Sequence, residues 1–492
     1  MLRVPSFDSV RAFGEFLAAS GYDTEHLGEG LGLSDGLHAN RGNLQALLCR
    51  TEGDTPLAVL ARLFFVAWPS EIEICRRAIP ESILELCLEA GVLTRAGSQL
   101  ESRCVLLPFH GLVIACDAPR LRGANPDFVI GPSPATHLLA RFLIKGSGES
   151  TLDIGTGSGV LALHAASYSD HVTGIDINER TLGFANFNAA LNGLKGVRFL
   201  CGDTFAPVEA GEFSRIVANP PFFLAPAKKF TYSDSPLDLD GYSRRLAIEA
   251  PRHLKDGGFF QMICEWVELD DCPWEQRLQQ WVKDSDCDVL VCQGPRIDPI
   301  SYAEKRQQEA TLLHTNPAET LFAERVNYFK ERKVRAIVGG VITMRKRQGA
   351  NWFSTLAADP THKDTGASIR ERFDTLTFAG THTERELLET RLRIADDVAL
   401  EQRNTLGAGG WEVAASELAR PGGLKDRLRL DAAVARFIHL FDGEHTVAQI
   451  AATVSESLGM PAEEAQAQCL RLARRLLQSS FVKPVQSAAA AR

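Results

Sequence analysis

Apolar residues in the middle of the chain form short runs that end in polar residues and are separated by longer helical stretches. Each run has the length typical of a strand. The predicted strands are one that ends at Asp153 and residues 172–175, 197–201, 215–218, 258–264, 288–292 and 334–344. Strands that alternate with helices in this way predict an α/β fold with a parallel sheet.

The segment before this pattern is predicted to be mainly helical. From about Ser6 to Leu33 the chain is predicted to be amphipathic helix, because apolar residues recur at three- and four-residue steps, and Gly21 ends the pattern. Further helices are predicted at residues 56–65, 71–77 and 81–90, and two strands at residues 103–108 and 112–117. Helices followed by a two-stranded hairpin indicate a winged-helix-like domain, which either presents a substrate or covers the core.

The end of the chain shows a second helical pattern. Helices are predicted at residues 432–440, 446–458 and 462–478, and Phe481 and Val482 are expected to begin a wing. Charges of both signs are interleaved here, so we expect contact with the rest of the chain rather than with nucleic acid. The predicted domains are an N-terminal domain 1–120, an α/β domain 121–348, a linker or irregular region 349–423 and a winged-helix-like domain 424–486.

Composition narrows the class of protein but indicates no chemistry. A chain of 492 residues with 45% hydrophobic and 23% charged residues is typical of globular proteins with two to four domains. The net charge of −9 disfavours non-specific coating of nucleic acid. No Cys-x-x-Cys spacing occurs, so no metal site is expected. Without a signal peptide or a membrane-spanning stretch, a cytoplasmic protein is expected, of undetermined oligomeric state.

The stretch Leu152-Asp153-Ile154-Gly155-Thr156-Gly157-Ser158-Gly159 predicts a strand, a tight turn and a helix start. The glycines permit positive φ and let a ligand lie against the backbone, where the free amides of the helix N-terminus face it. Their spacing is one residue tighter than the dinucleotide fingerprint, and the lysine of a phosphate-binding loop is missing. Alone, the turn also fits a structural connection between a strand and a helix.

Four polar residues follow successive predicted strands. These residues are Asp153, Asp176, Asp203 and Asn219. Open α/β sheets bind ligands at the carboxyl ends of their strands, and an acid about twenty residues after the glycines accepts hydrogen bonds from ribose hydroxyls. One such acid alone would fit a helix cap. Four in register predict a binding site.

Together, the glycine turn and these strand ends resemble the class I S-adenosylmethionine-dependent methyltransferases, over about residues 131–347. The resemblance implies a Rossmann-like seven-stranded sheet, here between mainly helical, winged-helix-like N- and C-terminal domains. It implies S-adenosyl-L-methionine as cofactor, with Asp176 at the ribose, Asp203 at adenine and Phe205 packed on the adenine ring. The residues implied around the rest of the cofactor are Asp153, Gly155, Thr156, Gly157, Gly159 and Asn219.

Asn219-Pro220-Pro221-Phe222 matches the motif of family members that methylate a nitrogen conjugated to a planar group. Such a nitrogen is a poor nucleophile because its lone pair is delocalised. The side-chain oxygen of Asn219 and the carbonyl of Pro220 can accept hydrogen bonds from its NH₂ group, and Phe222 offers a face for stacking. The predicted catalytic residues are therefore Asn219, Pro220 and Phe222, with no metal required.

Three alternatives for the function remain open. Asp240-Gly241 and Pro134-x-Thr136 resemble the glutamine methyltransferases, so the first choice is a glutamine side chain of a translation-associated protein. A Phe at the fourth motif position is frequent among ribosomal RNA guanine enzymes, so the exocyclic amino group of an RNA base is the second. A non-catalytic cofactor-binding scaffold is the third, which the intact Asn219 and glycines disfavour. The expected partner is a macromolecule, either protein or RNA.

Overall fold

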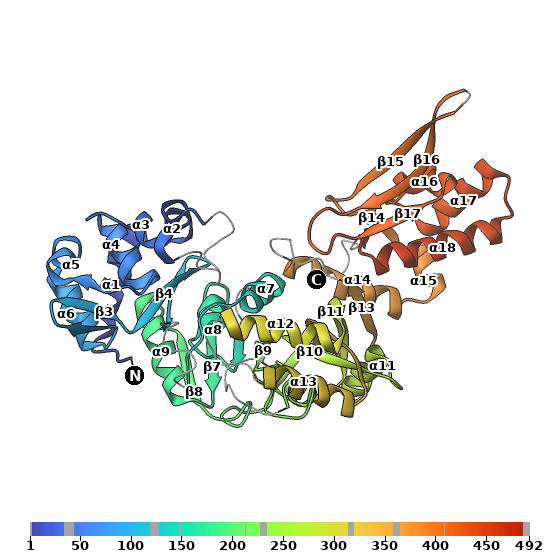
Figure 1. Ribbon diagram of the computed structural model, residues 1–492. Helices are drawn as coiled ribbons and strands as arrows, with labels where there is room; N and C mark the ends of the chain where they lie inside the picture. Colours follow the sequence, from blue (N-terminus) through green and yellow to red (C-terminus); the bar gives the residue numbers. More distant parts are fainter. Residues whose placement is uncertain are drawn as a thin grey trace. The chain divides into compact units, whose positions relative to one another are not determined.

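The computed structural model describes residues 2–33, 44–118, 127–146, 149–211, 213–226, 234–312, 319–357, 365–407 and 409–485 (Figure 1). The chain divides into two compact units. The first contains Met1–Ala140, Lys145–Gln348 and Thr355–Ala357, and the second contains Arg141–Ile144, Gly349–Ser354 and Ala358–Arg492. The predicted boundaries of the four domains stay predictions, and the one at residue 120 falls outside the described residues.

The first unit is built around a mixed eight-stranded sheet. Its strands are β6 (Ser150–Ile154), β7 (His171–Asp176), β8 (Val197–Cys201), β9 (Phe213–Ala218), β10 (Leu254–Leu269), β11 (Cys287–Ile297), β12 (Val334–Lys346) and β13 (Phe353–Ala357). Their order is β13-β11-β12-β10-β9-β6-β7-β8. Each predicted strand overlaps one of them, but the predicted count of seven is wrong because β13 adds an edge strand.

The sheet is parallel only in the half that carries the glycine turn. Strands β8, β7, β6, β9 and β10 pair in parallel, whereas β12 is antiparallel to both β10 and β11. The chain runs outward from β6 through β7 to β8, then returns to place β9 on the other side of β6. The order reverses between β6 and β9, and open α/β sheets bind ligands at such a point.

Within the described residues, α-helices lie between the strands of this sheet and directly before its first strand. They are α7 (Pro134–Phe142), α8 (Val160–Ala165), α9 (Glu179–Leu191), α10 (Gly241–Glu249), α11 (Trp274–Val282), α12 (Pro299–Leu312) and α13 (Glu319–Glu331). Helix α9 is buried along most of its length, from Thr181 to Leu191. One side of α9 therefore packs on the sheet, and its opposite side packs on a second part of the unit.

That second part is the N-terminal part of the first unit. Its elements are α1 (Phe7–Ala19), α2 (Thr24–Leu31), α3 (Leu44–Arg50), α4 (Pro56–Leu60), η1 (Ala61–Phe65), β1 (Ser70–Glu71), α5 (Ile72–Ala78), α6 (Glu81–Glu89), β2 (Leu93–Ala96), β3 (Gln99–Ser102), β4 (Cys104–Phe109) and β5 (Leu112–Asp117). The stretch predicted to be helical up to Leu33 forms two helices, and they separate at Gly21, where the predicted pattern ends. Gly21 adopts a positive φ of 72° and Asp23 caps a second helix, so the chain turns between α1 and α2.

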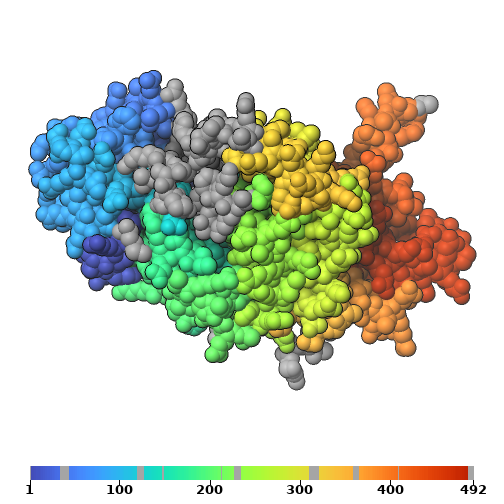
Figure 2. Space-filling model, turned by 60° about the horizontal axis from the view of Figure 1, so that its bottom comes forward, coloured from blue at the N-terminus to red at the C-terminus, as the bar shows by residue number. Residues whose placement is uncertain are grey.

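The N-terminal part and α9 share one hydrophobic core, to which α9 contributes Phe184, Phe187, Ala190 and Leu191. Asn188 on α9 and Asn192 directly after it also form hydrogen bonds with the backbone of β5, as a neighbouring strand would. The Asn188 side chain accepts from the Ala115 amide at 2.8 Å and donates to the Ala115 carbonyl at 3.0 Å. Asn192, one turn later, does the same for Val113 at 2.9 and 2.8 Å. Figure 2 shows the N-terminal residues in blue adjoining the teal residues of this half of the sheet.

The second unit contains both helices and sheets. Its elements are α14 (Gly366–Thr381), α15 (Glu384–Glu389), β14 (Arg391–Ile394), β15 (Ala399–Gly407), β16 (Gly410–Ala419), β17 (Arg427–Leu430), α16 (Ala432–Phe437), η4 (Ile438–Leu440), β18 (Asp442–Thr446), α17 (Val447–Leu458), α18 (Ala462–Gln478) and β19 (Val482–Pro484). The strands form two three-stranded sheets, β18-β14-β19 and β15-β16-β17. Among the described residues, no helix in either unit is both long and apolar enough to cross a membrane.

One expectation for the C-terminal third of the chain is wrong. Most of the region predicted to be linker or irregular is regular, because α14, α15, β14, β15 and β16 lie within residues 349–423. In the C-terminal domain, helices α16, α17 and α18 overlap the predicted helices, β19 begins at Val482, where a wing was expected, and β17 and β18 are additional strands. The physical reason is clearest in β15, where eight of nine side chains are exposed and no alternation of apolar and polar residues marks a strand.

Candidate functional site

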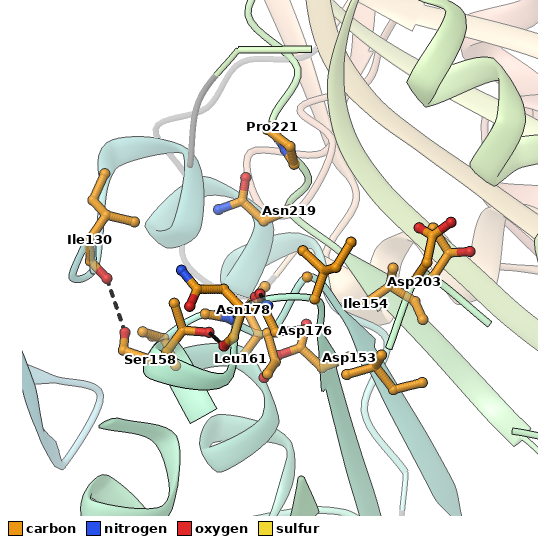
Figure 3. A pocket seen from close by; sticks show the side chains of 18 of the residues that line it. Ile130, Asp153, Ile154, Ser158, Leu161, Asp176, Asn178, Asp203, Asn219 and Pro221 are labelled. Atoms are coloured by element: carbon orange, nitrogen blue, oxygen red, sulfur yellow. Dashed lines mark hydrogen bonds between the residues drawn. The ribbon is translucent and has the colours of Figure 1, made fainter. Parts of the chain in front are cut away.

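A cavity of about 330 Å³ opens at the carboxyl ends of β6, β7 and β9, where the strand order reverses. Among the predicted site residues, those that line it are Asp153, Gly155, Thr156, Gly157, Asp176, Asp203 and Asn219. Figure 3 shows Asp153 and Asp176 below, with Asn219 and Pro221 above them. Gly159, Phe205, Pro220 and Phe222 are not among the lining residues.

The glycine turn leaves backbone open to the cavity. Gly155 and Gly157 have positive φ angles of 68° and 54°, and a Cβ built on either would meet nothing within 4 Å. That space is therefore available to a ligand rather than filled by the protein. Gly159 has a different role, since a Cβ there would lie 3.2 Å from Ala185 and Phe199. It allows α8 to pack closely on its neighbours.

Asp153 holds the glycine turn from beneath. One of its carboxylate oxygens, Oδ2, accepts hydrogen bonds from Thr156 Oγ1 at 2.7 Å and from the Ala162 amide at 3.0 Å. The carboxyl group is 1% exposed, and this burial raises the pKa of Asp153 to about 7. The group thus connects the turn to the start of α8 and lines the cavity as well.

Asp176, at the end of β7, connects the next strand to the same turn. Its Oδ2 accepts from the Gly157 amide at 2.9 Å, and its Oδ1 accepts from the Asn178 amide at 2.9 Å. Burial raises the pKa of Asp176, and the amide hydrogen bonds oppose that shift. Each carboxylate oxygen has two lone pairs, so both retain capacity for a ligand hydroxyl.

The far end of the cavity is lined by Asp203 and by two residues of α10. Asp203 forms a 3.1 Å ion pair with Arg245, and burial raises the pKa of the neighbouring Tyr242 to about 12. The sequence analysis missed Tyr242 and Arg245, although both follow Asp240-Gly241 at the predicted helix start. Asp240 itself is buried against Arg277 at 2.8 Å and the Val267 amide at 3.0 Å, so its contacts hold α10 in place.

Phe205 lies beside the cavity rather than along its wall. Its ring is 5% exposed and stacks on His253 at 4.5 Å with an interplanar angle of 7°. Packing of Phe205 on an adenine ring therefore stays a prediction.

The loop after β9 brings Asn219 to the cavity. The Asn219 Nδ2 donates to Thr136 Oγ1 at 3.1 Å, and within the described residues Asn219 Oδ1 makes no hydrogen bond. Figure 3 shows this oxygen on the side of Pro221, with the nitrogen turned away. Pro220 is buried, whereas Phe222 is half-buried with its ring edge-on to Phe223 at 5.2 Å. Asn219 is thus the predicted catalytic side chain that faces the cavity.

Buried charges support this loop from behind. The guanidinium of Arg306 lies 3.5 Å from the centre of the Phe223 ring and pairs with Glu265 at 3.0 Å. The Tyr302 hydroxyl accepts from the Leu224 amide at 3.1 Å and donates to Glu265 at 2.5 Å. Both Tyr302 and Arg306 belong to α12, in a segment where the sequence analysis identified no chemistry.

The opposite wall is held by the hairpin β4–β5. The Val129 amide donates to Asp117 Oδ2 at 2.7 Å, and Ser158 Oγ donates to the Ile130 carbonyl at 3.0 Å. A Cβ on Gly131 would lie 2.5 Å from Cys116 Sγ, so only glycine permits this approach. Arg180 adds a bidentate pair to Asp117 at 2.6 and 2.7 Å. The N-terminal part of the unit therefore shapes the cavity.

The residues present fit S-adenosylmethionine, the cofactor that the sequence resemblance implies. The volume lies within the range of small-molecule sites. The open backbone at Gly155 and Gly157 admits a ligand in close contact, and the buried carboxyl groups of Asp153 and Asp176 complement a ligand with positive charge and hydroxyl groups.

Three family models match separate parts of the chain. The model described as the methyltransferase small domain matches residues 132–283, which contain the glycine turn and the Asn219 loop. Two models described only as domains of unknown function match residues 19–103 and 371–484.

Curated relatives match the same central region. A release factor glutamine methyltransferase of Thermodesulfovibrio yellowstonii is 38% identical over 25% of this chain and 48% of the relative. The ribosomal RNA small subunit methyltransferase C of Alcanivorax borkumensis is 31% identical over 26% of this chain and 36% of the relative. The chain therefore spans less than half the length of these two relatives.

A third relative is matched more completely. It is a protein of Methanocaldococcus jannaschii with a provisional name as a protein N5-glutamine methyltransferase, 31% identical over 31% of this chain and 79% of the relative. Its match covers most of that protein, and the methyltransferase small domain contains the cavity-lining motifs. The chain belongs to the class I S-adenosylmethionine-dependent methyltransferases, and its cofactor is S-adenosyl-L-methionine.

Proposed function

We propose that this protein transfers a methyl group to a conjugated amino or amide nitrogen, and that its acceptor is a glutamine side chain of a translation-associated protein. The observation that carries the proposal is Asn219 Oδ1 at the edge of the cavity, on the loop after β9, an acceptor that receives no hydrogen bond from the described part of the chain. A planar NH₂ group carries two donors, and an amide oxygen at this position accepts one of them.

The cofactor is assigned to the glycine turn and the strand ends. Asp176 binds the ribose hydroxyls, the amides and hydroxyl around Gly155, Thr156 and Gly157 face the methionine part, and Asp203 lies at the adenine end. When bound, S-adenosylmethionine supplies an electrophilic methyl group on a sulfonium that leaves as a neutral thioether. Packing of Phe205 on adenine and a structural contribution of Gly159 belong to the same proposal.

The role of Asn219 is to aim and activate the acceptor. By accepting a hydrogen bond from the NH₂ group, Oδ1 directs the nitrogen lone pair toward the methyl group and stabilises the positive charge that develops on nitrogen. The Pro220 carbonyl accepts the second hydrogen, and Phe222 stacks on the planar group. Prolines suit this loop because they have no N–H that competes for these acceptors.

The names of the relatives favour glutamine over the alternatives. Two of the three relatives described above are named as glutamine methyltransferases. The ribosomal RNA relative supports the second candidate, an exocyclic amino group of adenine or guanine in RNA. The third candidate, a cofactor-binding scaffold, would not explain why the Asn219 side chain points its amide oxygen toward the acceptor side of the cofactor site.

The test uses the full chain, methyl-labelled S-adenosylmethionine and a translation extract as the source of acceptors. We expect a labelled product that protease destroys and nuclease does not. Asn219→Ala should lower kcat about 10²-fold and leave cofactor affinity in calorimetry unchanged, by analogy with the loss of one preorganised hydrogen-bond partner. The matched control is Asn186→Ala, an exposed asparagine on α9 that does not line the cavity.

Each outcome decides between the candidates. A product destroyed by nuclease alone would replace glutamine by an RNA base. Cofactor binding without any labelled product would support the scaffold, and wild-type turnover in Asn219→Ala would reject the amino-methylation mechanism.

A further inference from the structure

We infer that Thr136 is a positioning residue, which holds the amide of Asn219 with its oxygen toward the methyl acceptor. The inference rests on the proposed function, because it concerns how the same site presents its acceptor group. Thr136 lies in the first turn of α7, is 5% exposed and lines the cavity. It is 83 residues before Asn219 in the chain, so no local sequence pattern connects the two.

The hydrogen bonds around Thr136 form a closed set. Its Oγ1 accepts from Asn219 Nδ2 at 3.1 Å and from the Ser133 amide at 3.2 Å. Ser133 Oγ lies 3.0 Å from Thr136 Oγ1, where either hydroxyl can be the donor, and it accepts from the Thr136 amide at 3.2 Å. When the Thr136 hydroxyl is the donor in that pair, the bonds from Asn219 Nδ2 and the Ser133 amide use both lone pairs of its Oγ1, and the group presented to Asn219 is an acceptor. An acceptor at this point requires the nitrogen end of the Asn219 amide.

The orientation of this amide matters because its two ends have nearly the same shape and opposite hydrogen-bonding character. With Nδ2 on Thr136, Oδ1 is free to accept from an NH₂ group. With the amide reversed, Nδ2 would point at the NH₂ group, and two donors would face each other. A residue that fixes the amide therefore sets the fraction of enzyme molecules able to aim the acceptor nitrogen.

The same hydroxyl also stabilises the start of α7, so the test has to separate positioning from helix capping. Thr136→Val removes the hydroxyl at nearly constant shape, and Thr136→Ser retains it. Thr55→Val is the matched control, because Thr55 Oγ1 caps α4 through the Ala58 amide at 3.3 Å and Thr55 does not line the cavity. Asn219→Asp supplies a second background, since both oxygens of a carboxylate accept and reversal of the group has no consequence.

The measurement is methyl transfer from labelled S-adenosylmethionine into the extract fraction that the wild-type enzyme labels, with cofactor affinity by calorimetry. We expect Thr136→Val to lower kcat about five- to tenfold, the size expected for the loss of one neutral hydrogen bond, with cofactor affinity unchanged. Thr136→Ser should restore most of kcat, and Thr55→Val should not change it. In the Asn219→Asp background, Thr136→Val should lower kcat less than about twofold, because the pair no longer selects an orientation.

Two results would overturn the inference alone: wild-type kcat in Thr136→Val while Asn219→Ala is inactive, or an equal loss of kcat in both backgrounds. Wild-type turnover in Asn219→Ala, or no labelled product from the wild-type enzyme, would reject the proposed function and this inference with it.

Discussion

The hairpins β4–β5 and β15–β16 belong to different units and have opposite exposure to solvent. In β4–β5, nine of twelve residues are buried. In β15, every residue except the last is exposed. At the far end of β15–β16, Leu406 and Trp411 face each other across the strands and are 71% and 75% exposed. Two elements of the same type therefore have different structural roles.

The difference comes from what packs against each hairpin. Strand β5 is bound along its edge by Asn188 and Asn192, and its end is fixed by Arg180 through Asp117. In β15–β16, burial is confined to the end paired with β17, around Ser416 and Leu418. Figure 1 shows the rest of the hairpin extending beyond the helices of its own unit.

Because the side chains in the outer half of β15–β16 are exposed, they contribute mainly through cross-strand pairs, each worth about 0.2–1 kcal/mol. Side chains of β4–β5 take part in a core, and Asp117 holds the backbone at Val129, between the cavity-lining residues Phe128 and Ile130. Equivalent substitutions in the two hairpins should therefore have very different effects on stability.

The largest contrast is expected for the two arginine ion pairs. Arg180→Ala leaves the 2% exposed Asp117 carboxylate without its cation, and we expect the free energy of unfolding to fall by about 3–5 kcal/mol. Arg427→Ala removes solvent-screened pairs with Glu401 and Glu417 and should leave the free energy of unfolding close to that of the wild type. Chemical denaturation of both variants gives the comparison. Equal losses would mean that the exposed hairpin is held as firmly as the buried one.

A smaller contrast is expected for two asparagines. Asn188→Ala leaves the amide and carbonyl of Ala115 and the carbonyl of Ser158 without a partner, and should lower the free energy of unfolding by about 2–3 kcal/mol. Ser158 belongs to the glycine turn, so cofactor affinity should fall as well. The control, Asn404→Ala, is on the exposed strand β15 and should stay within about 0.5 kcal/mol of wild type.

Unchanged stability in Asn188→Ala would show that β5 does not depend on α9 for its edge. Reduced stability with unchanged cofactor affinity would show that the edge and the glycine turn are independent.

The sequence predicted the cavity better than its surroundings, and for a physical reason. Asp153, Asp176 and Asn219 each end a buried strand, and the parallel arrangement brings those ends together whatever packs outside. The contacts that hold them come from far away in the chain. One is the hydrogen bond between Thr136 and Asn219, and another is the hydrogen bond between Asp117 and the Val129 amide. Both depend on how loops approach the sheet, and local periodicity in the sequence does not encode that approach.

Two of the strands that prediction missed have few buried side chains. Strand β15 is exposed on both faces, so neither alternation nor a helical period marks it. Strand β13 adds an edge beyond the seven expected strands, and its burial is only partial. The turn between α1 and α2 depends on the positive φ of Gly21, which interrupts a pattern that otherwise continues with helical spacing.

The smallest effect is expected at the end of β15–β16. Trp411→Ser should change the free energy of unfolding by less than about 0.5 kcal/mol, because an indole that is 75% exposed loses little buried area when it is removed. Leu406→Ser is the matched variant, because Leu406 pairs with Trp411 across the strands. The double variant should differ from the sum of the two single variants only by the small interaction free energy of that pair. The contrasting buried variant is Leu106→Ser in β4, where a fully buried side chain is lost. A cost above about 1 kcal/mol for Trp411→Ser would mean that its ring is covered in solution, because cross-strand contact alone does not provide that much.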